Sequence, residues 1–261
     1  TVTNQLAAIA ERAGTPCYVY DMDFIRGRFA TLERLFGRNF GVSFAVKSNP
    51  NIELLRRLLP HVVTFDVSAY REVERALDAG CPADKITFSG PAKRRAEIEG
   101  AVDARIGELV LESLSEARIA SERAAALGVE QHVLIRINPS RGPRHFGVNF
   151  AGKASQFGID EEELEPAIDV VKALPSLKLI GFHIYSGTNS LNAEAIAENF
   201  GIFLDLFRTA SVHADIAPEK LIFGSGFGVP YTENDSALDV EALAALFMPM
   251  IDAFKADPRF A

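Results

Sequence analysis

The feature that most constrains the fold of this chain is a regular alternation of two kinds of segment. Short apolar runs rich in Val, Ile and Phe have the length of strands, and amphipathic stretches with a helical period follow them. We predict strands at residues 41–47, 62–67, 85–89, 108–112, 132–138, 177–185 and 220–224. We predict helices between them at residues 51–58, 70–79, 93–104, 115–127, 161–173 and 192–210. Such alternation indicates parallel strands joined by right-handed crossovers.

Seven strand–helix units in 261 residues favour an α/β fold of the (β/α)8 TIM-type barrel class, which typically needs about 250 residues. The alternative is a doubly wound open sheet, but the GxGxxG signature usual after its first strand is missing. No eighth strand is found, because the sequence stops at Ala261 just after a predicted helix at residues 240–256. It also starts at Thr1 without a methionine. We therefore expect one incomplete barrel domain over residues 1–261, with a leading segment at 17–20 and a helix at 23–36.

The composition excludes several classes of function. The formal net charge is −8 and no run of Lys and Arg occurs, so a nucleic-acid partner is not expected. No apolar stretch is long enough to span a bilayer and no signal peptide opens the chain, so we expect a cytoplasmic protein without a membrane partner. The two cysteines, Cys17 and Cys81, form no CxxC spacing. We expect reduced structural thiols and no bound metal.

Polar residues and a glycine end the predicted strands on one face. Because side chains alternate along a strand, the more apolar face should pack on the helices and the other face should point into the barrel. The inward face ends, strand by strand, in Lys47, Asp66, Ser89, Glu112, Arg136, Asn138, His183 and Gly224. A lone lysine is more often a surface residue, and a lone histidine is more often a hydrogen-bonded core residue. Converging on one barrel mouth, these groups would be costly to bury unless they surrounded a ligand.

A glycine-rich segment, Gly224-Ser225-Gly226-Phe227-Gly228, follows the seventh predicted strand. On its own this pattern more often marks a flexible turn, but barrels frequently bind phosphate at the loops after strands seven and eight. A lysine in a desolvated pocket can form a Schiff base. Lys47 and a phosphate site on the same mouth therefore indicate pyridoxal 5′-phosphate (PLP) as cofactor. A long loop at residues 139–158 also follows a strand end and is expected to be functional.

These segments together resemble the fold-type III, alanine-racemase-like PLP enzymes, and specifically the ornithine/diaminopimelate/arginine decarboxylase family. The resemblance runs from about Gly14 to Tyr231. Its matching pieces, in chain order, are residues 15–21 (TPCYVYD), 44–51 (FAVKSNPN), 65–68 (FDVS), 157–159 (FGI), 181–188 (GFHIYSGT) and 224–231 (GSGFGVPY). Each piece alone is weak, whereas the ordered series is highly specific.

The resemblance implies a role for each matching position near the reacting atoms. Lys47 matches the lysine that holds PLP as a Schiff base, and His183 matches the histidine that stacks on the pyridine ring. These two are the expected catalytic residues. Asp66 and Arg136 match a pair that supports the site near the cofactor ring. Glu112 and Ser89 lie at the mouth without an assigned role.

The resemblance also implies which residues bind the phosphate group. Ser186 matches a phosphate-binding hydroxyl, and Gly224, Ser225 and Gly226 match the glycine-rich phosphate loop. The family usually has glycine where this chain has Ser225, whose hydroxyl could add a phosphate contact. Members with a diamino-acid substrate often show Ser-Lys-Phe-Gly where this chain has Ser-Gln-Phe-Gly at residues 155–158.

The expected function is PLP-dependent decarboxylation of an amino acid through a Schiff base on Lys47. The substrate would be like diaminopimelate, ornithine or lysine, or it would be a conjugated amino acid. An amino-acid racemase of the same fold type and a non-catalytic PLP-binding barrel are the alternatives. The family's Glu-Pro-Gly-Arg segment on strand eight and its C-terminal β-domain are not in this chain. The family further implies a homodimer with shared active sites.

Overall fold

The computed structural model describes residues 2–143, 146–149, 151–152 and 155–260. The chain divides into two units, Thr1–Phe40 and Gly41–Ala261. The first unit contains helices α1 (Val2–Ala13) and α2 (Met22–Phe36). The Asp21 side chain caps α2 by accepting hydrogen bonds from two backbone N–H groups in its first turn. The predicted helix at 23–36 is confirmed as α2, whereas α1 was not predicted.

The second unit is built on a sheet of seven parallel strands, with hydrogen-bonded neighbours in the order β1-β2-β3-β4-β5-β8-β10. The strands are β1 (Ser43–Ala45), β2 (Thr64–Val67), β3 (Ile86–Phe88), β4 (Glu108–Leu111), β5 (Gln131–Asn138), β8 (Leu177–Ile184) and β10 (Lys220–Phe223). A short strand, β7 (Ile159–Asp160), pairs with β5, and β6 (Val148–Asn149) pairs antiparallel with β9 (Gly187–Thr188). The purely sequential strand order excludes the doubly wound alternative, in which the order reverses.

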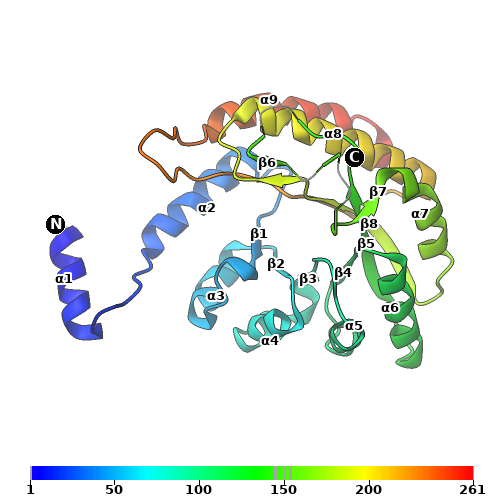
Figure 1. Ribbon diagram of the computed structural model, residues 1–261, viewed down its shortest axis with the longest axis horizontal. Coiled ribbons are helices and arrows are strands. Elements are labelled where there is room, and N and C mark those ends of the chain that lie inside the picture. Colours follow the sequence, from blue (N-terminus) through cyan, green and yellow to red (C-terminus); the bar gives the residue numbers. More distant parts are fainter. Residues whose placement is uncertain (1, 144–145, 150, 153–154, 261) are drawn as a thin grey trace. The chain divides into compact units, whose positions relative to one another are not determined.

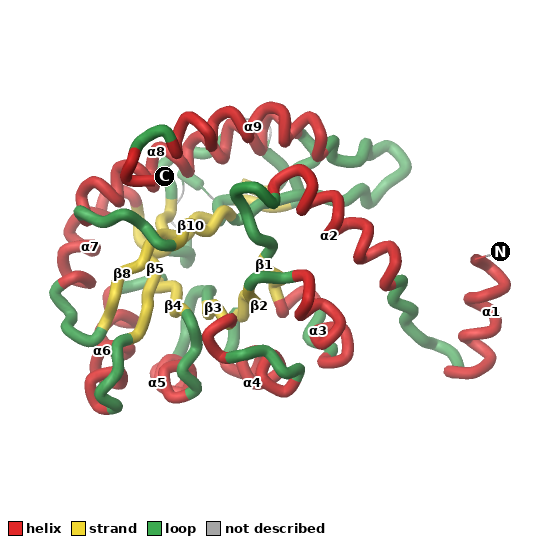
Figure 2. The backbone as a smooth tube through the Cα atoms, turned by 180° about the vertical axis from the view of Figure 1, so that it is seen from behind, coloured by secondary structure: helices red, strands yellow, loops and turns green. Residues whose placement is uncertain are grey.

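Helices follow the strands and lie on the outer side of the curled sheet (Figures 1 and 2). They are α3 (Ile52–Leu58), α4 (Tyr70–Asp78), α5 (Arg95–Asp103), α6 (Leu114–Ala126), α7 (Leu164–Lys172), α8 (Ala193–Ala214) and α9 (Val240–Lys255). The Asn51, Ser113, Asn192 and Asp239 side chains cap α3, α6, α8 and α9 at their amino ends. Among residues 224–260, all described, no further strand follows β10. The sheet is therefore a half-barrel, as expected for a TIM-type barrel without its eighth strand.

Three layers of side chains follow one another along the inner face of the sheet. At the amino ends, Lys220 Nζ lies 2.7 and 2.6 Å from the two oxygens of Glu108. The next layer is apolar and consists of Val110, Leu134 and Ile180, with Ile222 packed against them. Val110 and Leu134 precede Glu112 and Arg136 by two residues, so these two pairs share one face of the sheet. The apolar layer thus separates the ion pair below from the polar groups at the carboxyl ends.

Lys47 does not lie on the first strand, as the sequence predicts for residues 41–47. The strand ends at Ala45, and Lys47 belongs to a 3-10 turn, η1 (Val46–Ser48). The turn is closed because Asn49 N donates to Val46 O at 3.0 Å and Ser48 Oγ donates to Ala45 O at 2.8 Å. Lys47 nevertheless lies at the carboxyl end of β1.

Among the described residues, no helix combines the length and apolarity needed to cross a membrane.

Candidate active site

The strand register brings the carboxyl ends of the strands to one edge of the sheet. Ala45 of β1 is paired with Asp66 of β2, so Lys47 and Asp66 emerge beside each other. On the other side, Arg136 of β5 is paired with His183 of β8. Active sites of parallel barrels lie at this edge. We call this edge the mouth.

Lys47 reaches across the mouth from the first strand to the sixth in sheet order. Its side chain is exposed, and Nζ lies 5.9 Å from the centre of the Tyr185 ring, directly after β8. Lys47 is also close enough to Asp66 and His183 to affect the pKa of both. The structure therefore brings Lys47, Asp66 and His183 together, as expected for a cluster around one ligand.

Arg136 is buried and held by groups from three elements. Its Nη1 donates to Glu112 Oε1 of the adjacent strand end at 2.9 Å, and its Nη2 donates to the Tyr185 carbonyl oxygen at 3.2 Å. Its guanidinium lies 4.6 Å from the centre of the Phe157 ring, at the end of the long loop. Arg136 thus links β4, the loop and the residue that follows β8.

Glu112 makes three hydrogen bonds beneath the mouth. Besides pairing with Arg136, its carboxylate accepts from Gly90 N at 2.8 Å and from Gly158 N at 2.7 Å. Gly158 has a φ of +74°, and a Cβ there would lie 2.9 Å from Arg136 O, so glycine is required at this turn. A buried ion pair between Lys93 and Glu116 lies beside this network, with Glu116 accepting from Glu112 N. The end of the long loop is therefore fixed to the barrel through Glu112.

Asp66 is partly buried and carries a perturbed carboxyl group. Burial raises its pKa from 3.8 to about 6, against the lowering effects of the Ser89 hydrogen bond and of Lys47 and Arg136. The hydrogen bond from Ser89 Oγ to Asp66 Oδ1 is 2.7 Å long. Asp66 is therefore expected to change its protonation near pH 6, where the charge of Lys47 acts on it.

We expect Asp66→Asn to increase the stability of the protein without cofactor above pH 6. Because the folded pKa lies above the unfolded value of 3.8, the contribution of Asp66 to stability is full below about pH 4 and is lost as the pH rises through 6. Asparagine does not ionise, so the variant should unfold with a free energy higher by on the order of 1–3 kcal/mol at pH 8 and nearly equal at pH 4. Denaturant titrations at the two pH values measure this difference.

The control for this prediction is Asp103→Asn, which should lower the free energy of unfolding at pH 8 and not raise it. The hydrogen bond from Arg123 holds the pKa of Asp103 below its usual value, so the charged form stabilises the folded state. The control should show no gain at pH 8. An Asp66→Asn variant that gains as much at pH 4 as at pH 8 would contradict the assignment of the effect to ionisation.

His183 lies buried on the inner face, between Arg136 and the strand that precedes the glycine-rich segment. Burial lowers its pKa well below the usual value, and the positive charges of Arg136, Lys47 and Lys93 act in the same direction. The imidazole is therefore uncharged at neutral pH. Within the described part of the chain, its Nδ1 has no hydrogen-bond partner. A buried polar atom without a partner is a cost that a ligand could relieve.

Ser186 and the glycine-rich segment lie next to each other at the end of the mouth formed by β8 and β10. Ser186 is buried, and its Oγ lies 2.9 Å from Asn199 Oδ1 of α8. The Asn199 Nδ2 atom has no partner among the described residues. If the Asn199 amide turned by 180°, its Nδ2 would donate to Ser186 and would release the serine hydroxyl for another acceptor.

The glycine-rich segment is packed against both neighbouring loops. The Gly226 carbonyl accepts from Ser190 N at 2.9 Å, and Gly228 N donates to Ser190 O at 2.8 Å. Ser225, which precedes Gly226, is exposed. In the described part of the chain, no acceptor takes the backbone N–H of Ser225 or Gly226. These two donors remain available for an anion, as the sequence pattern predicts.

Sequence reasoning missed two residues at the mouth. Tyr185 lies two residues after His183, and the alternation of a strand places both side chains on the same face. The alternation alone therefore indicates that Tyr185 faces the mouth. Asn199 lies on the helix after Ser186, and no periodicity connects it to the mouth.

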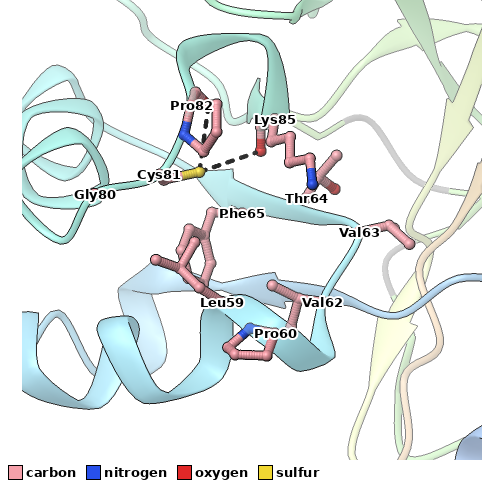
Figure 3. A pocket seen from close by; sticks show the side chains of 10 residues that line it. All are labelled: Leu59, Pro60, Val62, Val63, Thr64, Phe65, Gly80, Cys81, Pro82 and Lys85. Atoms are coloured by element: carbon pink, nitrogen blue, oxygen red, sulfur yellow. Dashed lines mark hydrogen bonds between the residues drawn. The ribbon is translucent and has the colours of Figure 1, made fainter.

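A separate cavity of about 310 Å³ lies at the amino ends of β2 and β3, lined by Leu59, Phe65, Cys81 and Lys85 among others (Figure 3). The Cys81 thiol donates to the carbonyl oxygens of Pro82 and Lys85. Burial raises the pKa of this thiol to about 11, so it is protonated at neutral pH and is a poor nucleophile. None of the residues of the mouth lines this cavity, which we therefore exclude as the reaction site.

Comparison with known proteins gives a family match over most of the chain. Residues 22–260 match the family model described as pyridoxal-dependent decarboxylase, pyridoxal binding domain. The L-glutamyl-(BtrI acyl-carrier protein) decarboxylase of Niallia circulans is 34% identical over 236 residues, which are 90% of this chain and 55% of that protein. The diaminopimelate decarboxylase of Zymomonas mobilis is 35% identical over 237 residues, 88% of this chain and 55% of that protein.

Solved structures of decarboxylases are also similar to this chain. The crystal structure of diaminopimelate decarboxylase from Helicobacter pylori complexed with L-lysine superimposes with a TM-score of 0.77 at 25% identity. The similarity covers 95% of this chain and 63% of that one. This chain thus spans little more than half the length of the relatives that it matches.

Proposed function

The chain belongs to the pyridoxal-dependent decarboxylases, as the match to their pyridoxal-binding domain over residues 22–260 shows, and on this premise we propose that its mouth binds PLP for amino-acid decarboxylation. The observation that carries the proposal is the cluster of Lys47, Asp66, Arg136 and His183 at one edge of the half-barrel. A lysine, a carboxyl group of raised pKa and a neutral buried imidazole are seldom brought together for structural reasons alone.

The side chains around Lys47 fit the ring of the cofactor. Lys47 is exposed into the mouth, and no hydrogen bond or ion pair engages its Nζ among the described residues, so its amine can attach the cofactor covalently. His183 offers a flat uncharged ring that suits stacking on a pyridine. Bound PLP supplies an electron-accepting ring that stabilises negative charge on the α-carbon after the carboxylate leaves as carbon dioxide. Asp66 and Arg136 would set the local charge around that ring.

The opposite end of the mouth fits the phosphate group. Ser225 and Gly226 provide two unengaged backbone N–H donors, and Ser186 provides a hydroxyl that Asn199 can orient. Gly224 allows the turn to lie directly against Tyr185. A turn with free N–H groups is a common anion site, and this one follows the seventh strand of the sheet in spatial order.

We propose a substrate with a free α-amino group and α-carboxylate, either like diaminopimelate, ornithine or lysine, or conjugated through its side chain. Two relatives support these two classes by name. One decarboxylates a glutamyl group on an acyl-carrier protein, and another is a diaminopimelate decarboxylase complexed with L-lysine. The exposed Gln156, where diamino-acid enzymes often have lysine, favours the conjugated class. A homodimer in the cytoplasm remains part of the proposal on the basis of the family resemblance.

The test is an assay of carbon dioxide release by the full-length protein with PLP. The panel contains meso-diaminopimelate, ornithine, lysine, arginine and glutamate bound to an acyl-carrier protein. We expect release of carbon dioxide and formation of the corresponding amine from at least one of them. Interconversion of enantiomers without carbon dioxide would indicate a racemase, and PLP binding without either reaction would indicate a non-catalytic barrel. Both outcomes would overturn the proposal.

A further inference from the structure

The Tyr185 ring lies near two cations of the mouth, Lys47 and Arg136. Lys47 Nζ is 5.9 Å from the centre of its ring, and the guanidinium carbon of Arg136 is 6.0 Å from the same point. The face of an aromatic ring attracts a cation placed within about 6 Å of its centre. The side chain is only partly buried, so the ring borders the space in which a ligand would lie. No role follows for Tyr185 from the sequence motifs.

The position of this ring is fixed by two neighbouring elements. The Tyr185 carbonyl oxygen accepts a hydrogen bond from Arg136 Nη2 at 3.2 Å. A Cβ atom on Gly224 would lie 2.2 Å from Tyr185 Cδ2 and 2.6 Å from its Cβ, so the glycine-rich segment packs directly on the tyrosine. The arginine therefore holds the backbone of Tyr185, and the turn at Gly224 confines its side chain on one side.

Tyr185 is also part of an alternating row of rings and cations. The row runs from Phe157 to Arg136 at 4.6 Å, to Tyr185 at 6.0 Å and to Lys47 at 5.9 Å. Arg136 is anchored by its ion pair with Glu112. Lys47 ends the row, and in the described part of the chain its Nζ makes no hydrogen bond or ion pair. The Tyr185 ring therefore contacts the lysine amine, which the charge of Asp66 also attracts.

We propose that Tyr185 is a positioning residue, whose ring holds the Lys47 amine at the point of the mouth where PLP attaches. This inference rests on the proposed function, because that function has Lys47 attach the cofactor. The ring acts through its face, so the phenolic hydroxyl is not required. Tyr185→Phe should therefore behave like the natural protein, and variants that lack a ring should not.

The experiment is a spectrophotometric titration of the full-length protein, stripped of cofactor, with PLP. Absorbance of lysine-bound cofactor gives a dissociation constant and a rate of attachment for each variant. We expect Tyr185→Leu and Tyr185→Met to weaken attachment roughly three- to fivefold, and Tyr185→Phe to attach the cofactor like the natural protein. The control is Tyr231→Leu, which removes a tyrosine that is 78% exposed and should change nothing. Two ring-less variants are included in case one of them fails to fold.

A merely structural role would lower the melting temperature without selectivity for Lys47. We therefore reduce each PLP-treated variant with borohydride and compare labelling of Lys47 with that of Lys85, which is exposed away from the mouth. A selective loss at Lys47 supports the proposal. Equal attachment in the Leu and Met variants, or an equal loss in the Phe variant, overturns it. Absence of attachment in the natural protein would instead overturn the proposed function itself.

Discussion

Replacing Lys47 with alanine is expected to abolish covalent attachment of PLP and to lower decarboxylase turnover by at least about 10³-fold. No other described lysine lies near the Tyr185 ring, His183 and Asp66 with a free Nζ, because Lys93 is buried in an ion pair with Glu116. The Lys47 side chain is exposed, so its removal should leave the melting temperature nearly unchanged. The measurements are the absorbance spectrum with PLP, carbon dioxide release and thermal unfolding.

The matched control for this variant is Lys85→Ala. Lys85 is an exposed lysine at the cavity near the amino ends of β2 and β3, and its substitution should affect neither the spectrum nor turnover. The assignment of Lys47 would be contradicted if Lys47→Ala kept both the absorbance of lysine-bound cofactor and normal turnover.

The second large effect concerns Glu112, which is buried and pairs with the buried Arg136. Glu112→Ala leaves the guanidinium without its charged partner and leaves the N–H groups of Gly90 and Gly158 without an acceptor. Breaking a buried pair on one side typically costs about 3–5 kcal/mol of unfolding free energy. Chemical denaturation of the protein without cofactor measures this loss independently of any catalytic role.

The control is Glu99→Ala, which removes a glutamate from an ion pair with Arg95 on the protein surface. Exposed pairs are typically worth less than about 1 kcal/mol, so this variant should unfold almost like the natural protein. Glu112→Gln should fall between the two, because the amide oxygen still accepts a hydrogen bond but the charge is lost. If Glu112→Ala and Glu99→Ala lower the free energy of unfolding by the same amount, the hydrogen bonds and the ion pair of Glu112 do not stabilise the fold as described.

Much of the fold follows from the periodicity of the sequence. Apolar runs of strand length and amphipathic stretches are local signals, and they predict all seven strands of the sheet and their parallel arrangement. The face on which Asp66, Arg136 and His183 lie was also predictable, since strict alternation relates each to the apolar residues around it. The error at Lys47 has a local cause, because the hydrogen bonds that close η1 do not appear in an apolar pattern.

The contacts between distant loops were not predictable in this way. The acceptor role of Glu112 toward Gly90 and Gly158 depends on where two loops meet, and neither loop has a periodic pattern. The glycine-rich segment was read as a site for an anion, which its free N–H groups support. Its structure adds a steric reason for Gly224, which leaves room for the Tyr185 ring. That reason depends on the spatial neighbourhood of β8 and β10, which the sequence does not contain.

The shifted pKa values of two groups at the mouth have a common consequence. Asp66 is held in a site that disfavours its charged form, and the His183 imidazole is held neutral. Groups in such environments lower the stability of the folded protein when no ligand is bound. Perturbed pKa values of this kind are typical of active sites. The variant Asp66→Asn should therefore be more stable above pH 6, whereas Glu112→Ala should be less stable at neutral pH.

The central claim is that Lys47 carries the cofactor, and peptide mapping tests it most directly. The full-length protein is incubated with PLP, reduced with borohydride and digested, and the modified peptide is identified by mass spectrometry. A pyridoxyl-phosphate group on Lys47 in close to one copy per chain is the expected result. A Lys47 peptide that remains unmodified while the label is absent or spread over other exposed lysines would contradict it.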